Sequence, residues 1–274
     1  MFNCCGIKHI VADVRKELKW HSQLRTIEGR NMPNAATPFL TDKKILIIAP
    51  HADDELIGCH QLIINNKDTV TVFYCSLLGS NYSDENRATR LAEFGNYISG
   101  QGCNYVVSSL ATLCDDLSRV IRDINPSYIF IPSYVDWQKE HRLVNEVLEE
   151  VLNNIDREVV IGWYHVSLPI PCSFINSFSF LTRKKYRNKW QAMRNNYKSQ
   201  LHMDIMRFGF IERSLAKKTY AYETYIIMPK GEWYRCIQVL KKQIKEIDSL
   251  KDSLGNIKEM FEKTDSVYRK IYCQ

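Results

Sequence analysis

A histidine and two aspartates stand together directly after an apolar run. His51, Asp53 and Asp54 follow the segment "ILIIA" at 45–49 and precede a segment with helical spacing. Further along the chain, His141 lies in a second polar cluster, "YVDWQKEHR". Two imidazoles and one carboxylate can bind a divalent cation and leave coordination positions open for water and substrate. We therefore expect a metal site made by the two histidines and one of the aspartates.

Each cluster also has a simpler explanation. Asp53 or Asp54 could be the N-cap of the helix expected at 55–65, where a carboxylate satisfies free backbone amides. His141 could be an exposed polar residue at the start of its own helix. The position of both clusters at one edge of a sheet would favour the metal site over these alternatives.

The hydrophobic pattern predicts such an edge. Apolar or β-branched runs alternate with stretches of helical spacing, which indicates βαβ units and a parallel sheet with helices on both faces. Ligands bind beyond the carboxyl ends of the strands in such sheets, and both polar clusters follow expected strands. The expected strands are 44–49, 69–75, 104–108, 127–132 and 158–166, and the helices between them are 55–65, 84–99, 112–124 and 141–155.

The remaining segments complete the predicted organisation. We expect a further helix at 183–207 and a strand at 219–229, at an edge of the sheet. The chain then divides into an N-terminal extension (1–42), a main domain (43–229) and a C-terminal tail (230–274). Apolar residues recur in the tail at intervals of three or four. It is therefore expected to be an amphipathic helix or a short helical hairpin, which packs on the main domain or associates with a second copy.

The composition excludes several classes of protein. Hydrophobic residues make up 45% and charged residues 25%, as in globular proteins. No apolar run is long enough to span a bilayer and the N-terminus lacks the pattern of a signal peptide, so we expect a cytoplasmic protein. The nine cysteines include no CxxC pair, and they fit neither a disulfide framework nor a cysteine zinc site.

Positive charge is concentrated in one segment. The formal net charge is +6, but residues 183–218 alone hold eleven Lys and Arg against Asp204 and Glu212. Such a segment is either a solvated helical face or the place where an anionic partner binds. A nucleotide-sugar diphosphate, a lipid phosphate and a membrane surface are partners of this kind.

Several short motifs together resemble the LmbE-like, or PIG-L, deacetylase family. The motifs are "APHADDE" at 49–55, similar to the family's "AHPDDE", "RLAE" at 90–93, "EHR" at 140–142, "KWQAMRNNYKSQ" at 189–200 and "AYETY" at 221–225. The resemblance spans about residues 43–228, most of the chain. It implies a Rossmann-like, three-layer α/β fold with a mostly parallel sheet, to which this chain adds a C-terminal helical extension.

The resemblance also implies a zinc-dependent hydrolase. His51, Asp54 and His141 would hold Zn²⁺ or another divalent metal. Asp53 would be the general base, which takes a proton from the metal-activated water as it attacks an acetamide carbonyl. The metal would stabilise the resulting oxyanion.

Further roles follow from the same resemblance. Arg90, or Arg87, would contact a sugar hydroxyl or a phosphate, and Glu93 would belong to the same substrate site. Asp136 and Glu140 would orient His141. Alternatively, Asp136, Glu140 or His165 would supply the proton that the departing amine needs.

Two positions depart from the family pattern. Ala52 stands where the family has proline, which removes no ligand. Gln138 stands where the family often has a histidine that polarises the carbonyl or protonates the leaving group. Glutamine can donate a hydrogen bond to an oxyanion but cannot supply a proton at neutral pH.

The implied activity is removal of the acetyl group from an N-acetylated amino sugar of the GlcNAc type, nucleotide- or lipid-linked, in polysaccharide biosynthesis. The expected partner is this substrate and not a nucleic acid, and homo-oligomerisation is left open. Gln138 motivates an alternative, a catalytically impaired metal- and sugar-binding protein of the same fold. A non-haem iron oxygenase also uses two histidines and a carboxylate. Such enzymes are usually built on β-sandwich or jelly-roll folds, which this alternation of strand and helix does not match.

Overall fold

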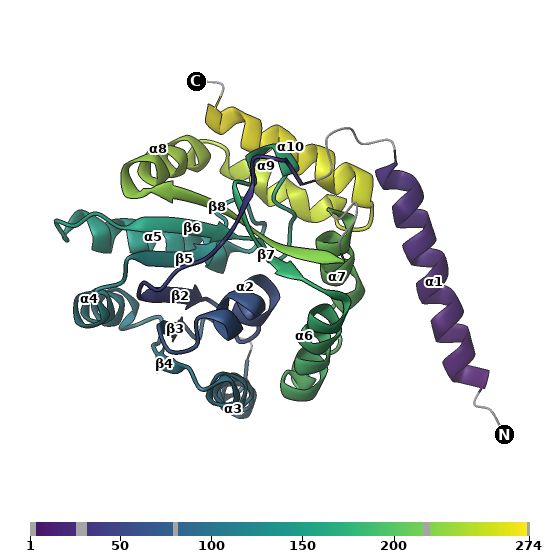
Figure 1. Ribbon diagram of the computed structural model, residues 1–274, viewed down its shortest axis with the longest axis horizontal. Helices are drawn as coiled ribbons and strands as arrows, with labels where there is room; N and C mark the ends of the chain where they lie inside the picture. The colour runs from purple at the N-terminus through teal and green to yellow at the C-terminus, as the bar shows by residue number, and fades with distance from the viewer. Residues whose placement is uncertain (1–3, 26–31, 79–81, 216–219, 273–274) are drawn as a thin grey trace.

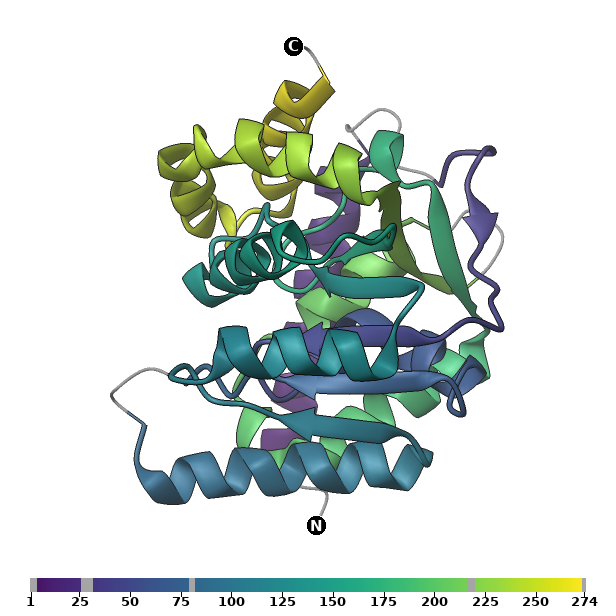
Figure 2. The ribbon, with the colours of Figure 1, turned by 90° about the vertical axis from the view of Figure 1, so that its left-hand side faces the viewer.

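The sheet is the central layer of a three-layer α/β structure (Figures 1 and 2). The computed structural model describes residues 4–25, 32–78, 82–215 and 220–272, with side chains from residue 14 onward. The described strands are β1 (Thr37–Pro38), β2 (Ile45–Ala49), β3 (Val70–Tyr74), β4 (Asn104–Val107), β5 (Tyr128–Pro132), β6 (Val160–Tyr164), β7 (Ser177–Leu181) and β8 (Ala221–Pro229).

These strands form one sheet in the order β1-β7-β8-β6-β5-β2-β3-β4. Strand β8 runs antiparallel to both of its neighbours, and every other pair is parallel. The mostly parallel three-layer α/β class expected from the sequence is therefore confirmed. The five strands predicted from apolar runs all lie in this sheet.

Helices cover both faces of the sheet (Figure 1). One face is covered by α4 (Leu113–Ile124), α5 (Lys139–Asn153), α8 (Lys230–Lys241), α9 (Ile244–Ser249) and α10 (Ile257–Tyr272), and the other by α2 (Asp54–Asn65), α3 (Asp84–Gln101) and α6 (Arg183–Asn196). Helix α7 (Ile205–Ser214) contributes side chains to both cores, and α1 (Cys4–Leu24) packs beside it.

Strand β2 shows why a continuous apolar run in the sequence predicted a buried strand. Leu46 and Ile48 face the core beneath α4 and α5, while Ile45 and Ile47 face the core beneath α2 and α3. All are fully buried, because a central parallel strand is covered on both faces. The polar residues that follow the strand therefore begin at the edge of the sheet.

The expectation of an edge strand at 219–229 is wrong. Strand β8 lies inside the sheet, between β6 and β7. Its polar residues Glu223 and Thr224 are buried and not turned to solvent, because Glu223 pairs with the buried ammonium of Lys189. The strands β1 and β7, at that end of the sheet, had no counterpart in the sequence-based prediction.

The single helix expected at 183–207 is also wrong. It is divided into α6, a short 3₁₀ turn at Lys198–Gln200 and α7. The helical backbone ends at Tyr197, whose φ is −107° and ψ 56°. Glu93 of α3 accepts hydrogen bonds from the backbone N–H and the hydroxyl of Ser199, so a tertiary contact fixes the break.

The C-terminal tail packs on the rest of the molecule (Figure 2). Trp233, Ile237 and Ile257 are fully buried in the same core as Ile161 of β6 and Met228 of β8. Of the two alternatives for the apolar residues of the tail, the structure shows packing on the main domain. From the N-terminal segment, β1 pairs with β7, and Trp20 of α1 packs on Phe210 with ring centroids 5.1 Å apart.

No helix among the described residues is long and apolar enough to cross a membrane. Cys59 and Cys75 are free and fully buried, so they pack as small hydrophobic residues.

Candidate metal centre

The turn after β2 places two carboxylates at the start of α2. The Asp54 carboxylate accepts a hydrogen bond from the backbone N–H of His51 at 2.8 Å, which closes the turn. Asp53 occupies the N-cap position, but its side chain makes no capping hydrogen bond. Its backbone is held at φ 129°, a conformation that favours glycine. The side chain of Asp53 therefore does not cap α2, and its carboxylate is available to a ligand.

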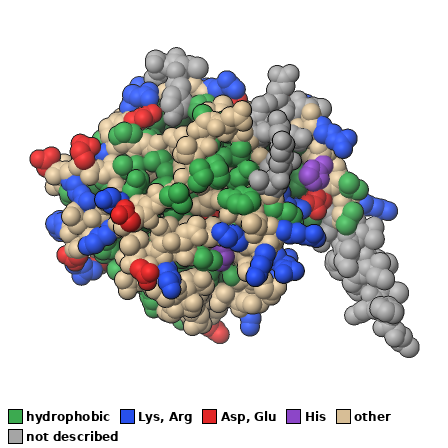
Figure 3. All heavy atoms as spheres, viewed as in Figure 1, with side chains coloured by type: hydrophobic (Ala, Val, Ile, Leu, Met, Phe, Trp, Pro, Cys, Tyr) green, Lys and Arg blue, Asp and Glu red, His purple; other side chains and the backbone are tan. Residues whose placement is uncertain are grey.

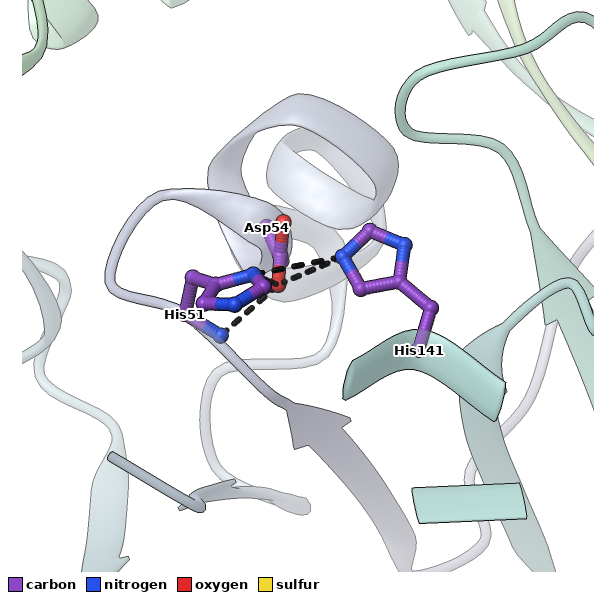
Figure 4. A group of neighbouring side chains, drawn as sticks. All are labelled: His51, Asp54 and His141. Atoms are coloured by element: carbon purple, nitrogen blue, oxygen red, sulfur yellow. Dashed lines mark hydrogen bonds and ion pairs between the residues drawn. The ribbon is translucent and has the colours of Figure 1, made fainter. Parts of the chain in front are cut away.

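Three ligand groups converge at this turn (Figure 4). His51 Nδ1 lies 3.2 Å from Asp54 Oδ2, and His141 Nε2 lies 3.4 Å from the same oxygen. The two ring nitrogens are 3.3 Å apart. Ligand atoms about 2.0–2.1 Å from a tetrahedral Zn²⁺ lie roughly 3.3 Å from one another. The spacing of this donor set therefore fits a single divalent cation without rearrangement.

Asp136 holds the ring of His141 in this orientation. Its Oδ2 lies 3.1 Å from His141 Nδ1, on the side of the ring away from Asp54. The same carboxylate accepts hydrogen bonds from the backbone N–H groups of Gln138, at 2.9 Å, and Ser167, at 3.2 Å. A carboxylate behind a histidine in this way fixes which ring nitrogen faces the metal.

The charges of the cluster are strongly coupled. Burial alone would lower the pKa of His141, but the facing carboxylates of Asp136 and Asp54 raise it to about 10. Burial would raise the pKa of Asp54, yet His141 and His51 bring it well below its usual range. Burial and the negative charges of Asp54 and Glu55 raise the pKa of Asp53 well above its ordinary value. Concentrated carboxylate and imidazole groups of this kind are typical of a cation site.

The cluster opens into a cavity of about 310 Å³. Of the residues expected at the site, six contribute to its wall: His51, Asp53, Asp54, Arg90, Gln138 and Glu140. The volume lies at the lower end of the range for small-ligand pockets, which is about 300–1,000 Å³. The cavity therefore has room for a small ligand.

Arg90 is the buried cation of this cavity. Its side chain is 5% exposed, and Nη1 makes no hydrogen bond within the described part of the chain. Buried guanidinium groups are normally satisfied, so an unpaired Nη1 beside a cavity is available to a ligand oxygen. Arg87 and Glu93 do not line the cavity: Arg87 donates to the carbonyl oxygen of Leu78, and Glu93 binds Ser199.

Gln138 has a defined partner in the position where the family often has histidine. Its amide nitrogen donates to the hydroxyl of Ser167 at 2.6 Å. Of the alternative proton sources, Asp136 lies behind His141, and His165 is buried, 1% exposed, away from the cavity wall. Only Glu140 among them lines the cavity.

His202 was not among the residues expected at the site. It lines the same cavity, and its Nδ1 lies 3.0 Å from the carbonyl oxygen of Ser199. His202 stands two residues beyond the "YKSQ" motif, and its place depends on the break after α6. In the sequence, only the nearby "YKSQ" motif indicated that His202 could lie at the site.

A buried ion network supports the helix that carries the site. Helix α2 is kinked at Cys59, whose φ of −134° and ψ of 15° are not helical. The Gln61 N–H donates instead to Glu223, at 2.9 Å and 3.1 Å from its two oxygens, and the Ile57 carbonyl accepts from Lys189 Nζ at 2.6 Å. Lys189 Nζ also lies 2.7 Å from Glu223 Oε1. The ion pair thus replaces a helical hydrogen bond inside α2.

The fold and this site define an α/β protein with the architecture of LmbE-like deacetylases and a His-Asp-His cluster suited to a divalent metal. Among solved structures, a triple mutant of a deacetylase of the teicoplanin pathway is similar over 68% of this chain and 98% of its own, with a TM-score of 0.53 and 14% identity. The zinc-inhibited form of a teicoplanin deacetylase is similar over 68% and 98%, with a TM-score of 0.52 and 12% identity.

A conserved protein from Thermus thermophilus is similar over 67% of this chain and 94% of its own, with a TM-score of 0.50 and 16% identity. No family model matches the sequence, and no curated protein matches it. At these identities the likeness concerns the fold, and the fold implied by the LmbE-like resemblance is confirmed.

Proposed function

We propose that this chain is a zinc-dependent N-deacetylase that removes the acetyl group from an N-acetylated amino sugar. One observation carries the proposal: three ligand atoms, from His51, Asp54 and His141, stand at the spacing of ligands around one cation, beside an uncommitted Asp53. The similar structures support the choice of reaction, since they include teicoplanin deacetylases, one described in a zinc-inhibited form and one in complex with teicoplanin.

A divalent cation at this site would supply a Lewis acid that acidifies water and polarises the amide carbonyl. We assign to Asp53 the transfer of a proton from the attacking water to the departing nitrogen. Asp53 lines the cavity next to the donor set and uses its carboxylate neither as a cap nor in the set itself. General acid–base transfer by a positioned carboxylate contributes about 10²–10⁴ in rate.

Arg90 and Gln138 are assigned to substrate recognition. The unpaired Nη1 of Arg90 can bind a hydroxyl or phosphate oxygen of the sugar. The Gln138 amide, anchored on Ser167, can donate to the acetamide oxygen. His202 and Glu140 line the same cavity and can bind further polar groups of the substrate.

The substitution Asp53→Asn tests the assignment of the base. It removes the proton-accepting charge and keeps the shape of the side chain, so zinc content should be unchanged while hydrolysis falls by about 10²–10⁴. Acetate release from a panel of N-acetylated amino sugars measures turnover, and mass spectrometry measures zinc. Retained turnover would show that another group is the base.

Two histidine variants provide a matched control for the metal. His141→Ala should lose bound zinc, whereas His202→Ala, which removes a cavity histidine outside the donor set, should keep it. Equal zinc content in both variants would contradict the proposed ligand set.

Gln138 supports a second candidate, a metal- and sugar-binding protein without turnover. Its side chain lies where the family often supplies an acid–base histidine. Zinc bound at one equivalent, with sugar binding but no acetate from any member of the panel, would favour this candidate over the deacetylase.

A further inference from the structure

A second cavity lies on another part of the molecule, between α6, α7 and the C-terminal half of α1. Its volume is about 710 Å³, and none of its lining residues lines the cavity of the metal centre. Figure 3 shows Lys and Arg side chains gathered over α6, on the side facing α1. The charged residues of this basic groove are Arg183, Lys184, Arg187, Arg194, Arg213 and Glu17.

Among the described residues, Glu17 is the one carboxylate that lines the basic groove. Glu17 is already paired with Arg213. The other four cations are exposed and have no carboxylate within 4.0 Å among the residues that the structure describes. Helix α6 carries no acidic residue at all. A solvated charged face normally mixes both signs, with pairs three or four residues apart.

The placement of these cations also opposes helix stability. Arg183, Lys184 and Lys185 occupy the first turn of α6, next to the positive end of the helix dipole. Cations at this end of a helix are unfavourable, so stability of the helix does not explain them. Arg183, Arg187 and Arg194 repeat at intervals of four and seven, which puts them on one face of α6, with Trp190 between them.

Aromatic side chains form the floor of the basic groove. Trp190 is almost fully buried beneath it, and the rings of Tyr186 and Tyr220 meet edge to face with centroids 4.9 Å apart. Gly209 makes room for the Tyr186 hydroxyl, since a Cβ there would lie 2.3 Å from it. Half-buried tyrosine rings next to guanidinium groups suit a ligand that combines a planar ring with anionic groups.

We propose that the basic groove binds a nucleoside diphosphate or a molecule built on one, with the phosphates on Arg187 and Arg194 and the base against Tyr186 and Tyr220. Guanidinium groups bind phosphate oxygens in pairs of parallel hydrogen bonds. The volume fits a ligand of this size. The concave, aromatic-floored shape favours a small molecule over the plane of a bilayer. This site does not depend on the proposed deacetylase activity.

Isothermal titration calorimetry with uridine diphosphate and adenosine diphosphate tests the proposal on the full chain, after treatment with a chelator so that no metal mediates binding. The native protein should bind with an affinity that falls as salt rises. The double substitution Arg187→Glu and Arg194→Glu should weaken binding by about 100-fold, because each lost charged hydrogen bond is worth roughly tenfold or more.

Lys185→Glu is the matched control, since Lys185 is exposed on the same helix and does not line the basic groove. It should leave the affinity within about twofold. Tyr220→Ala should weaken the binding of the nucleoside diphosphates but not that of inorganic diphosphate, which has no ring. Absence of binding to the native protein, or equal loss in the Lys185 variant, would overturn the proposal. So would charge-dependent binding to phosphatidylglycerol vesicles without binding of either nucleotide.

Discussion

Asp53 combines backbone strain with burial of a carboxylate. Its φ of 129° lies in the region that favours glycine, and its side chain is 4% exposed next to Asp54 and Glu55. Both features cost folding free energy, and the nearby charges of Arg90 and His141 do not keep the pKa of Asp53 from rising. Strain of this kind is concentrated at functional sites, where the structure around it holds a side chain in place.

The strain at position 53 can be measured with two substitutions. Asp53→Gly and Asp53→Ala both remove the carboxylate, but only glycine relaxes at this φ, so the glycine variant should be more stable by about 1 kcal/mol. Urea unfolding of the metal-free proteins gives the difference. Equal stability of the two variants would mean that the backbone at this turn is unstrained.

Asp136 should control metal affinity through His141. Asp136→Asn keeps an acceptor for the backbone N–H of Gln138 but weakens the hold on His141 Nδ1, so zinc affinity should fall by about 10–100-fold. Competition with a chromophoric chelator measures the affinity. Asp265→Asn, which alters an ion pair with the exposed Arg269 of α10, is the control and should bind zinc as the native protein does.

The cluster of His51, Asp54 and His141 was predictable from sequence, and its surroundings were not. His51 and Asp54 follow one expected strand directly, and His141 lies in the first turn of the helix after another, where parallel topology brings distant segments to one edge. His202 and Lys189 reach their places through the break after α6 and the kink in α2. Both are consequences of tertiary contacts, made by Glu93 and Glu223, that no local pattern records.

At the scale of elements, α2 depends on a buried cluster of one ammonium and two carboxylates. Lys189 is hydrogen-bonded to both Glu212 and Glu223, and all three are fully buried. One negative charge is left uncompensated, and burial, together with the charge of Glu223, raises the pKa of Glu212 to about 7 despite Lys189. We therefore expect the stability of the kinked helix α2 to depend on pH through Glu212.

Glu212→Gln should change how stability depends on pH. A carboxyl with a raised folded pKa binds more protons in the folded than in the unfolded state, so its contribution to stability is present below about pH 4.5 and is lost as pH rises toward 7. Relative to native protein, the glutamine variant should gain roughly 2 kcal/mol between pH 5 and pH 8. Chemical unfolding at both pH values measures this.

Glu150→Gln, at an exposed position of α5, is the matched control and should follow the native pH dependence. If the stability of the native protein and of the Glu212 variant depended on pH in the same way, the pKa of Glu212 would not change on folding.

The strands of the sheet were predictable to different degrees. The central strands read as continuous apolar runs because both of their faces are covered. Strand β7, "SFSFL", alternates polar and apolar residues over only five positions and gave no clear signal. Strand β8 was predicted, but its position inside the sheet was not, because Glu223 and Thr224 are polar residues typical of an exposed strand. Both are buried, and Glu223 pairs with Lys189.

At the scale of the whole molecule, the tail belongs to the main core. Trp233 is fully buried in the core that also contains Ile161 and Met228. Trp233→Ala should therefore lower the free energy of unfolding by about 3–5 kcal/mol, as expected for a large-to-small change in a packed core. Leu110→Ala, at a side chain 66% exposed, should change it by less than about 0.5 kcal/mol. A small effect at Trp233 would mean that the tail is held only loosely.

The interior position of β8 has a consequence for biosynthesis. Strand β6 and the β1–β7 pair are joined within the described sheet through β8, which is the last strand of the sequence. A nascent chain leaving the ribosome therefore carries two open strand edges until residue 229 has been synthesised. Translation products that stop before Ala221 keep those edges, which makes them templates for intermolecular pairing and dependent on chaperones or proteolytic clearance.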